Sequence, residues 1–345
     1  MTCTILSWNI LAESLEQIPQ STDSRPLSWR LPKILETVLH HRPAIIAFQE
    51  VELPAFQTIS SCLKVHGYHG QHCLRRQLPP FTDTPLSAPQ LPAPPFGQAI
   101  FWKTALLRHT RSAHIPLRVY SKAPQVIQII QLRDRWGAEY NVANAHLSPR
   151  PNSDIQGKQA HMIVSIAQAL GLLGQNVKPH TQLILCGDLN SVPVSPACRY
   201  LHQFFQGIGN QDSPWTNVFR DHSKHTIDYI LTARKKNWRV SPTRVLDTWA
   251  PNFLSDHRPV VSTVSYCSKE VRRPWNTFKA HVKSPLIQRV CHYYNQAHCR
   301  NGPQCYHIHR CSKCAEKHPF RLHFSSLETD SKEPDAKESL GEQEE

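Results

Sequence analysis

Residues 183–191, Leu-Ile-Leu-Cys-Gly-Asp-Leu-Asn-Ser, constrain the fold of this chain more than any other stretch. Four apolar residues followed by a glycine predict a buried strand that reaches the end of a sheet. Asp188 and Asn190 come next, two positions apart, a spacing at which extended backbone projects side chains to the same side. A carboxylate there can orient a water, and an amide can bind a phosphate oxygen. The alternative is an ordinary turn in which Asp188 binds its own backbone.

The charge and length of the chain favour an α/β protein with a polyanionic partner. Its 345 residues suffice for one large domain and an appendage, and the formal charge is +13. We therefore expect nucleic acid as the first partner and an anionic membrane surface as the second. No stretch has the apolar length of a membrane span, and no secretory signal is visible. Together with the absence of a visible secretory signal, the odd count of 11 cysteines predicts an intracellular protein, cytoplasmic or nuclear and not secreted.

Two strands near the N-terminus carry polar side chains at their ends. Residues 2–11 alternate as a strand does and include Asn9, and the apolar run 44–48 leads into Gln49 and Glu50. A helical pattern lies between the two strands, and strands joined in this way end at the same edge of a sheet. We therefore expect Asn9 and Glu50 to be neighbours.

Two amphipathic helices are predicted, over residues 28–40 and 155–173, because apolar side chains recur there at helical spacing. Ser28 is the expected N-cap of the first helix. Pro32 is then expected in its first turn, where a missing backbone N–H is tolerated. Helices that alternate with strands in this manner indicate an α/β fold.

Further strands are predicted over residues 98–102, 125–132, 140–146 and 226–231. His146 ends one of them, Asp228 interrupts another, and Asp256 and His257 precede a last strand. A buried Asp228 requires a partner, and an imidazole nitrogen is a natural one. These residues could be unrelated loop positions, but six polar strand ends in one chain disfavour that interpretation.

The short motifs around these residues resemble those of the endonuclease/exonuclease/phosphatase family across residues 1 to about 266. They read Ser7-Trp-Asn-Ile10, Phe48-Gln-Glu50, Ala145-His-Leu147, Gly187-Asp-Leu-Asn-Ser191, Ile227-Asp-Tyr-Ile230 and Ser255-Asp-His-Arg-Pro259. Residues 188–196 and 97–103 look most like the deadenylase and nocturnin-like branch. The resemblance implies a two-sheet α/β sandwich and Mg²⁺- or Mn²⁺-dependent hydrolysis of phosphodiesters.

The resemblance also implies which residues lie at the metal ion. Glu50 would be the principal Mg²⁺ ligand, with Asn9 and Asp256 near it. This set agrees with the chemistry of Mg²⁺, which takes few carboxylates and keeps positions for water and substrate phosphate.

The remaining polar residues are implied to act on the water and the phosphate. Asp188 would orient and activate the attacking water, and Asn190 would hold the scissile phosphate. His257, paired with Asp228, would contact a phosphate oxygen, and His146 would make a further phosphate contact. Such contacts neutralise the charge on the phosphate during attack.

A cluster of cysteines and histidines near the C-terminus predicts a Zn²⁺ site. Three thiolates and one imidazole satisfy tetrahedral Zn²⁺, and so short a segment requires the metal to fold. The spacing resembles that of CCCH zinc fingers that bind single-stranded RNA, and its ligands are Cys291, Cys299, Cys305 and His309. A second zinc site resembling a zinc knuckle is an open alternative to a reduced thiol pair, with Cys311, Cys314, His318 and His323. The candidate RNA contacts are Tyr293, Tyr294, Tyr306 and Arg300.

These interpretations divide the chain into a catalytic domain over residues 1–268, with a proline-rich surface loop at 78–96, and a zinc module over 285–324. An acidic tail over 325–345 is expected to be disordered. The favoured function is a 3′–5′ exoribonuclease of the poly(A) deadenylase type, with the zinc module binding RNA. A DNA-directed endonuclease, a 2′,5′-oligoadenylate phosphodiesterase and a catalytically inactive RNA-binding scaffold remain alternatives. The sequence leaves the oligomeric state open.

Overall fold

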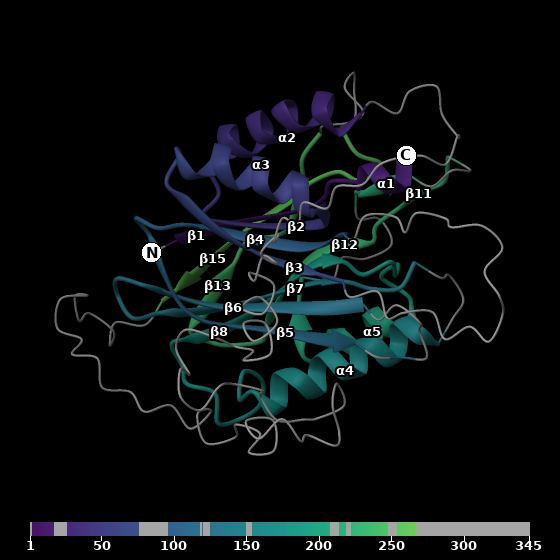
Figure 1. Ribbon diagram of the computed structural model, residues 1–345. Coiled ribbons are helices and arrows are strands. Elements are labelled where there is room, and N and C mark those ends of the chain that lie inside the picture. The colour runs from purple at the N-terminus through teal and green to yellow at the C-terminus, as the bar shows by residue number, and fades with distance from the viewer. Residues whose placement is uncertain are drawn as a thin grey trace, which may run out of the picture. The chain divides into compact units, whose positions relative to one another are not determined.

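The computed structural model describes residues 2–16, 26–75, 96–117, 119, 125–149, 154–207, 214–218, 222–247 and 254–267. Two mixed β-sheets pack face to face at the centre of this part of the chain (Figure 1). The first sheet has the order β13-β15-β1-β2-β4-β3, with β14 also paired to β15. Its strands are β1 (Thr2–Asn9), β2 (Ile45–Glu52), β3 (Tyr68–Leu74), β4 (Phe96–Lys103), β13 (Trp238–Val240), β14 (Arg244–Val245) and β15 (Val260–Tyr266).

The second sheet has the order β5-β6-β7-β8-β12-β9. Its strands are β5 (Leu107–Leu117), β6 (Gln125–Asp134), β7 (Glu139–His146), β8 (Thr181–Asp188), β9 (Phe205–Gln206) and β12 (Asp228–Ala233). A two-stranded ribbon of β10 (Asn217–Val218) and β11 (Lys224–His225) lies apart from both sheets in the pairing order. The predicted two-sheet α/β sandwich is confirmed.

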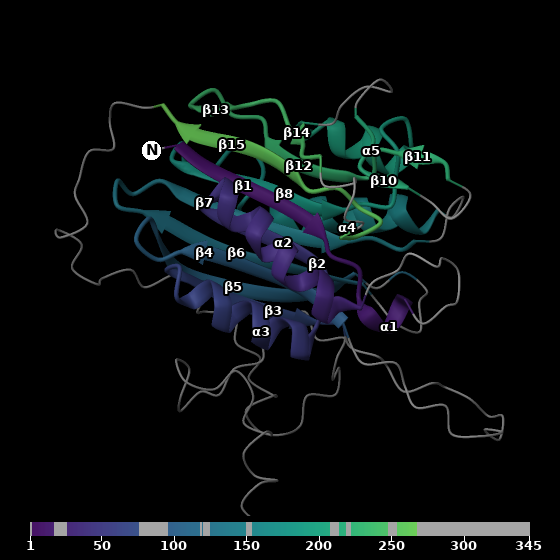
Figure 2. The same ribbon diagram turned by 90° about the horizontal axis from the view of Figure 1, so that it is seen from above.

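Helices cover the outer faces of both sheets (Figures 1 and 2). The first sheet is covered by α2 and α3 and the second by α4 and α5, while α1 is a single short turn of helix. The helices are α1 (Glu13–Glu16), α2 (Leu27–His41), α3 (Leu53–Lys64), α4 (Ile155–Ala169) and α5 (Pro196–His202). No helix in the described ranges is long and apolar enough to cross a membrane.

The hydrophobic core has three layers because each sheet buries both of its faces. Between the sheets, Ile5 and Ile100 of the first meet Tyr140 and Ile184 of the second, all of them fully buried. Separate clusters join each sheet to its helices. This double burial explains why the central strands are near-continuous apolar runs and why polar residues within them stand out.

Helix α2 forms where its apolar periodicity predicts, but its start differs from the prediction. The helix begins at Leu27 with Pro26 as the N-cap, and no side chain caps it, so the assignment of Ser28 is wrong. Pro32 consequently lies beyond the first turn. The buried face of the helix, which packs on the first sheet, outweighs the loss of one helical hydrogen bond.

Candidate active site

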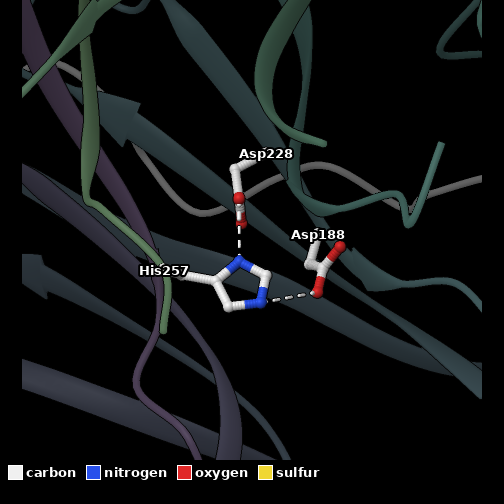
Figure 3. A group of neighbouring side chains, drawn as sticks. All are labelled: Asp188, Asp228 and His257. Carbon is white, nitrogen blue, oxygen red and sulfur yellow. Dashed lines mark hydrogen bonds and ion pairs between the residues drawn. The ribbon is translucent and has the colours of Figure 1, made fainter. Parts of the chain in front are cut away.

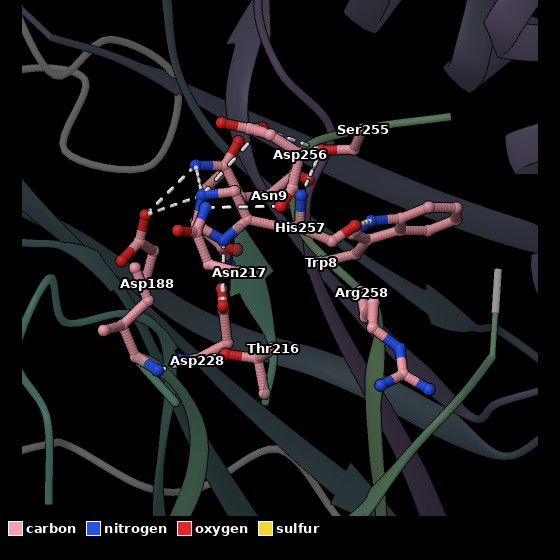
Figure 4. A network of polar contacts seen from close by, with 12 residues as sticks. Trp8, Asn9, Asp188, Thr216, Asn217, Asp228, Ser255, Asp256, His257 and Arg258 are labelled. Carbon is pink, nitrogen blue, oxygen red and sulfur yellow. Dashed lines mark hydrogen bonds and ion pairs between the residues drawn. The ribbon is translucent and has the colours of Figure 1, made fainter. Parts of the chain in front are cut away.

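The ends of several strands bring polar side chains to one end of the sandwich (Figure 4). In the first sheet, β1 and β2 run parallel and pair Asn9 with the residue before Glu50. In the second, parallel β7 and β8 pair His146 with Asp188, and antiparallel β12 sets Asp228 opposite the same Asp188. Strand register therefore accounts for the convergence.

Glu50 is turned toward this site by an irregularity in β2. The pairing of β2 with β4 shifts register between Gln49 and Val51, and Glu50 has a left-handed backbone with φ of 57°. A bulged residue leaves the ladder and re-aims its side chain, at a cost of about 1–3 kcal/mol for a non-glycine residue. The Glu50 carboxylate accepts hydrogen bonds from the Asn9 amide at 3.0 Å and from the Ala12 backbone N–H at 3.1 Å.

Asn9 links the carboxylates of the two sheets. Its Nδ2 donates to Glu50 Oε1 at 3.0 Å and to Asp188 Oδ2 at 3.1 Å, and it approaches His257 Nε2 at 3.4 Å. Its Oδ1 accepts from the Leu11 backbone N–H at 3.0 Å, which fixes the side chain. One amide group thus gathers two carboxylates and an imidazole around a single point.

Asp228 and His257 form a buried hydrogen-bonded pair (Figure 3). His257 Nδ1 donates to Asp228 Oδ2 at 2.8 Å, so that Nε2 faces Asp188 Oδ2 at 3.5 Å. The Ser255 hydroxyl holds the backbone before the imidazole, because it accepts from the His257 N–H at 3.1 Å and donates to the Asn9 carbonyl at 2.7 Å. The carboxylate fixes the tautomer and orientation of the ring.

Electrostatics favour a protonated His257. Burial raises the pKa of Asp228 to about 6, and Asp188 adds to the rise while His257 opposes it. Burial would lower the pKa of His257, but the charges of Asp228, Asp256 and Asp188 raise that pKa well above its ordinary value. At neutral pH the proton therefore resides on the imidazole, where it presents a positive charge toward Asp188.

Asp188 uses its two oxygens differently. Oδ1 accepts from the Asn190 backbone N–H at 2.8 Å, which is the turn expected as an alternative from the sequence. Oδ2 remains directed at Asn9 and the two imidazoles. Asn190 itself has a left-handed backbone, and its amide donates to the Leu147 carbonyl at 3.0 Å. The residue is thus held beside Asp188 by two local hydrogen bonds.

His146 and Asp256 complete the set of predicted residues. His146 Nε2 lies 3.5 Å from Asp188 Oδ2 and 3.9 Å from Glu50 Oε1. Asp256 Oδ1 lies 4.0 Å from His257 Nε2, and its side chain is 43% exposed, which places it at the rim. All eight predicted residues therefore belong to one connected group. The geometry leaves their chemical roles as predictions.

The donor atoms of this group suit a divalent ion. Asp188, Asp228 and His257 offer ligand atoms within 4.8 Å of one another and form a candidate metal site within the described ranges. Asp228 Oδ2, however, is already bound to the imidazole N–H. Carboxylate oxygens are ligands that Mg²⁺ prefers, and Glu50 Oε1 and Asp188 Oδ2 both face Asn9 Nδ2, whereas the Asn9 amide oxygen accepts from the Leu11 N–H. The residues therefore fit a Mg²⁺ ion on the Glu50 side of the site.

Comparison with known families decides the class of protein. The profile of the endonuclease/exonuclease/phosphatase family matches residues 6–257. The chain belongs to this family. Its members hydrolyse phosphodiesters or phosphate esters and use divalent metals.

The chain is similar to two known proteins in sequence and to solved structures in fold. Nocturnin of Drosophila melanogaster is 28% identical over 204 residues, which are 56% of this chain and 29% of that protein. Carbon catabolite repressor protein 4 homolog 3 of Arabidopsis thaliana is 27% identical over 275 residues, 77% of this chain and 51% of that protein. The chain thus spans about half or less of these relatives. The crystal structure of ANGEL2, a 2′,3′-cyclic phosphatase, shares the fold with a TM-score of 0.59 at 19% identity, covering 76% of this chain and 95% of that one.

A buried arginine that the sequence analysis missed holds the site together. Arg30 of α2 is only 1% exposed and donates to the carbonyls of Ile10 at 2.6 Å, Leu11 at 2.8 Å and Leu254 at 2.8 Å. These segments follow Asn9 and precede the Asp256–His257 pair, so one side chain ties both to the helix. An arginine on the apolar face of a predicted amphipathic helix was the available signal.

A polar network between the sheets links the strands that carry the site, and the sequence analysis did not predict it. The Gln49 amide donates to Asn144 Oδ1 at 2.8 Å and to the Ser7 hydroxyl at 3.1 Å, while the Asn144 amide donates to the Phe48 carbonyl at 2.9 Å. Each residue lies in a strand that carries a predicted site residue. Polar residues within apolar runs could have indicated this network, because a buried amide requires hydrogen-bond partners.

The remaining predictions concern parts of the chain outside the described residues. These are the proline-rich segment, most of which falls within 76–95, and everything from residue 268 onward, including both zinc sites, the tyrosines and the acidic tail.

Proposed function

We propose that this chain is a Mg²⁺- or Mn²⁺-dependent nuclease that acts on RNA, as a 3′–5′ exoribonuclease of the poly(A) deadenylase type. The observation that carries the proposal is the meeting of Glu50, Asn9, Asp188 and the Asp228–His257 pair at one end of the sandwich. The similarity to Nocturnin and to a carbon catabolite repressor protein 4 homolog supports the branch. The net charge of +13 supports a polyanionic substrate.

Glu50 would hold the metal ion, with Asn9 and Asp256 close to it. When bound, such an ion neutralises the charge that develops on the phosphate and polarises its oxygens. The Glu50 carboxylate is prepared for this by two hydrogen bonds and by a strained backbone that aims it into the site. Asn9 brings the Asp188 carboxylate to the same point.

Asp188 orients the attacking water in this proposal. Its Oδ1 is committed to the turn at Asn190, which leaves Oδ2 as the oxygen that can accept a proton from water. Because strand register and the Asn190 turn fix the carboxylate, the water is directed along one line of attack. Asn190, held next to it by two local hydrogen bonds, would bind the scissile phosphate.

His257 binds a phosphate oxygen as an imidazolium. Asp228 holds the ring from Nδ1 and, together with Asp256 and Asp188, keeps its pKa well above the ordinary value. The N–H at Nε2 is then a charged donor at the site, which stabilises negative charge on the phosphate. His146, on the opposite side of Asp188, supplies a second imidazole.

The C-terminal region is proposed to be a Zn²⁺-binding module over residues 285–324 that binds single-stranded RNA, in a chain whose residues 1–268 form the catalytic domain. Attachment of the module to RNA would raise the effective concentration of substrate at the active site. We expect Cys299→Ser to release zinc and to weaken RNA binding more than turnover at saturating RNA. Unchanged zinc content in that variant would contradict the assignment.

Substrate choice tests the proposal directly. Purified full-length protein with Mg²⁺ is incubated with 3′-oligoadenylated RNA, the matching DNA, 2′,5′-linked oligoadenylate and RNA ending in a 2′,3′-cyclic phosphate. We expect a ladder of products shortened from the 3′ end of the oligoadenylated RNA. Glu50→Ala and Asp188→Ala should abolish it while RNA binding persists, and Glu36→Ala on the exposed face of α2 is the matched control.

The other arms identify the alternatives. Internal cuts in DNA would identify a DNA endonuclease, and digestion of the 2′,5′ linkage alone would identify an oligoadenylate phosphodiesterase. Opening of the cyclic phosphate alone would place the chain with phosphatases of this fold, such as ANGEL2. RNA binding without any hydrolysis would leave a catalytically inactive scaffold.

A further inference from the structure

The bulge in β2 that aims Glu50 is anchored on both sides. Before Glu50, the carbonyl of Gln49 accepts from the Ile10 backbone N–H at 3.2 Å. After Glu50, the carbonyl of Val51 accepts from His72 Nε2 at 2.9 Å. The imidazole is the donor in this contact, because a carbonyl oxygen only accepts. The left-handed backbone of Glu50 therefore lies between two residues that are each held by a hydrogen bond.

His72 belongs to β3 and reaches across β4 to make this contact. The order of the first sheet places β4 between β2 and β3. His72 pairs with Ala99 of β4, and Val51 pairs with Gly97 of the same strand. Because residues two apart on a strand face the same side, the β4 positions between the two partners carry only a methyl group and a hydrogen. This leaves room for the imidazole to span the strand.

An aromatic ring of α3 fixes the imidazole in this position. Helix α3 runs along β3 (Figure 2), and the rings of Phe56 and His72 are stacked, with centroids 4.8 Å apart and an interplanar angle of 10°. Phe56 in turn lies against the fully buried Phe101 of β4, with ring centroids 5.5 Å apart. The stack holds the face of the imidazole, so its N–H edge is directed at Val51. The hydrophobic core thus sets the direction of one hydrogen bond at the bulge.

We propose that His72 is a positioning residue for Glu50. By holding the Val51 carbonyl, the imidazole fixes the left-handed backbone of Glu50 and with it the direction of the carboxylate. A left-handed conformation is unfavourable for glutamate and persists only where neighbouring contacts impose it. Because a bulge disrupts the strand ladder locally, a side chain that bonds the next carbonyl supplies part of that constraint.

Metal binding depends on this direction. The Glu50 carboxylate is the group that would hold the metal ion, and this consequence rests on the proposed function, whereas the positioning itself does not. Loss of the imidazole N–H should weaken metal binding although every ligand is retained. A residue with a structural role alone would lower stability and leave the metal affinity of the folded protein unchanged.

The first test uses the full-length protein without metal. The Ala12 backbone N–H donates to Glu50 Oε2 at 3.1 Å, so its hydrogen exchange, followed by NMR, reports the position of the carboxylate. His72→Phe keeps a ring to stack on Phe56 but removes the donor. Exchange at Ala12 should then accelerate about twofold to tenfold, the range for one neutral hydrogen bond. His72→Gln keeps an N–H donor and should stay closer to the unmodified rate, and His72→Leu serves if His72→Phe does not fold.

The second test measures the Kd for Mn²⁺ from the EPR signal of the unbound ion, in the absence of RNA. Glu50→Ala gives the Mn²⁺ bound elsewhere on the protein. We expect His72→Phe to raise the Kd by a factor similar to that for exchange and His72→Gln to restore most of the affinity. His69→Phe is the matched control, because His69 lies on the same strand but its ring contacts Trp102, with centroids 5.0 Å apart. Neither measurement should change in this variant.

The outcomes distinguish this proposal from the proposed function. Unchanged Ala12 exchange in a folded His72→Phe variant would overturn the role of His72, and so would equal changes in His72→Phe and His72→Gln. Mn²⁺ binding that persists in full in Glu50→Ala would instead overturn the assignment of the metal ligand. In that case exchange at Ala12, which needs no metal, would still decide whether His72 positions Glu50.

Discussion

Replacement of Arg30 by methionine is expected to destabilise the domain and to loosen the active site together. Arg30 makes three hydrogen bonds of 2.6–2.8 Å to main-chain carbonyls, two of them buried and one part-buried. Hydrogen bonds to a charged group contribute about 1.5–3 kcal/mol each, but the guanidinium lost several kcal/mol of hydration on burial. With both effects, and with three carbonyls left without this donor, we expect a loss of about 3–5 kcal/mol in the free energy of unfolding.

Urea and thermal unfolding measure this change. A domain of this size loses about 2–4 °C in Tm per kcal/mol, so the Tm of Arg30→Met should fall by roughly 6–20 °C. Arg30→Lys keeps the charge but lacks the planar fork that reaches three carbonyls. Its Tm should therefore lie between those of the unmodified protein and Arg30→Met. Lys64→Met on the exposed surface of α3 is the control, with an expected change within about 0.5 kcal/mol. A change below about 1 kcal/mol for Arg30→Met would refute the reasoning.

Three further substitutions test other parts of the structure. Asp228→Asn should lower kcat by about 10²–10⁴ and move the alkaline limb of the pH–rate profile to lower pH, because the carboxylate that raises the pKa of His257 is lost; an unmoved limb would contradict the role of the pair. Gly187→Ala should destabilise strongly and impair activity, since a Cβ there would lie 1.8 Å from the Ala145 carbonyl oxygen and φ is 142°; an unchanged Tm would show that β7 and β8 are not in this register. Burial raises the pKa of Tyr68 to about 12. The protonated phenol therefore stabilises the fold fully below pH 10, and this contribution should be lost as the pH rises from 10 to 12. Tyr68→Phe should flatten that part of the curve of unfolding free energy against pH, measured by urea titration.

The strand ends were predictable from the sequence because two independent patterns coincide there. Apolar runs fix where β2, β7 and β8 end, and parallel pairing then carries those ends to one edge. The neighbourhood of Asn9 and Glu50 follows from these rules, and the structure confirms it with a contact of 3.0 Å. The cost of burying a lone carboxylate predicted an imidazole partner for Asp228, the family resemblance implied that the partner is His257, and the structure shows that pair with a contact of 2.8 Å.

Other features depend on tertiary structure and had no local signal strong enough to predict them. Strand β3 and helix α3 were not predicted; Leu53–Lys64 has moderate amphipathicity and no side-chain cap, and it forms because its buried face packs on the first sheet. The incorrect N-cap at Ser28 has the same origin, since the packing of Leu27 moves the N-cap two residues earlier, to Pro26. The left-handed backbone of Glu50 is the clearest case, because nothing in Phe-Gln-Glu-Val indicates a bulge.

That bulge shows why sequence rules fail where the site begins. Glutamate is a poor choice for a left-handed position, and glycine at residue 50 would relieve the backbone strain. The fold retains the strain because alternation along a regular β2 would leave side chains 49 and 51 on one face and side chain 50 on the other. With the bulge, Gln49 still reaches Asn144 between the sheets, while the Glu50 carboxylate leaves the ladder and reaches Asn9 and the Ala12 N–H. Local preference and site geometry conflict at this residue, and the surrounding hydrogen bonds decide the conflict in favour of the geometry.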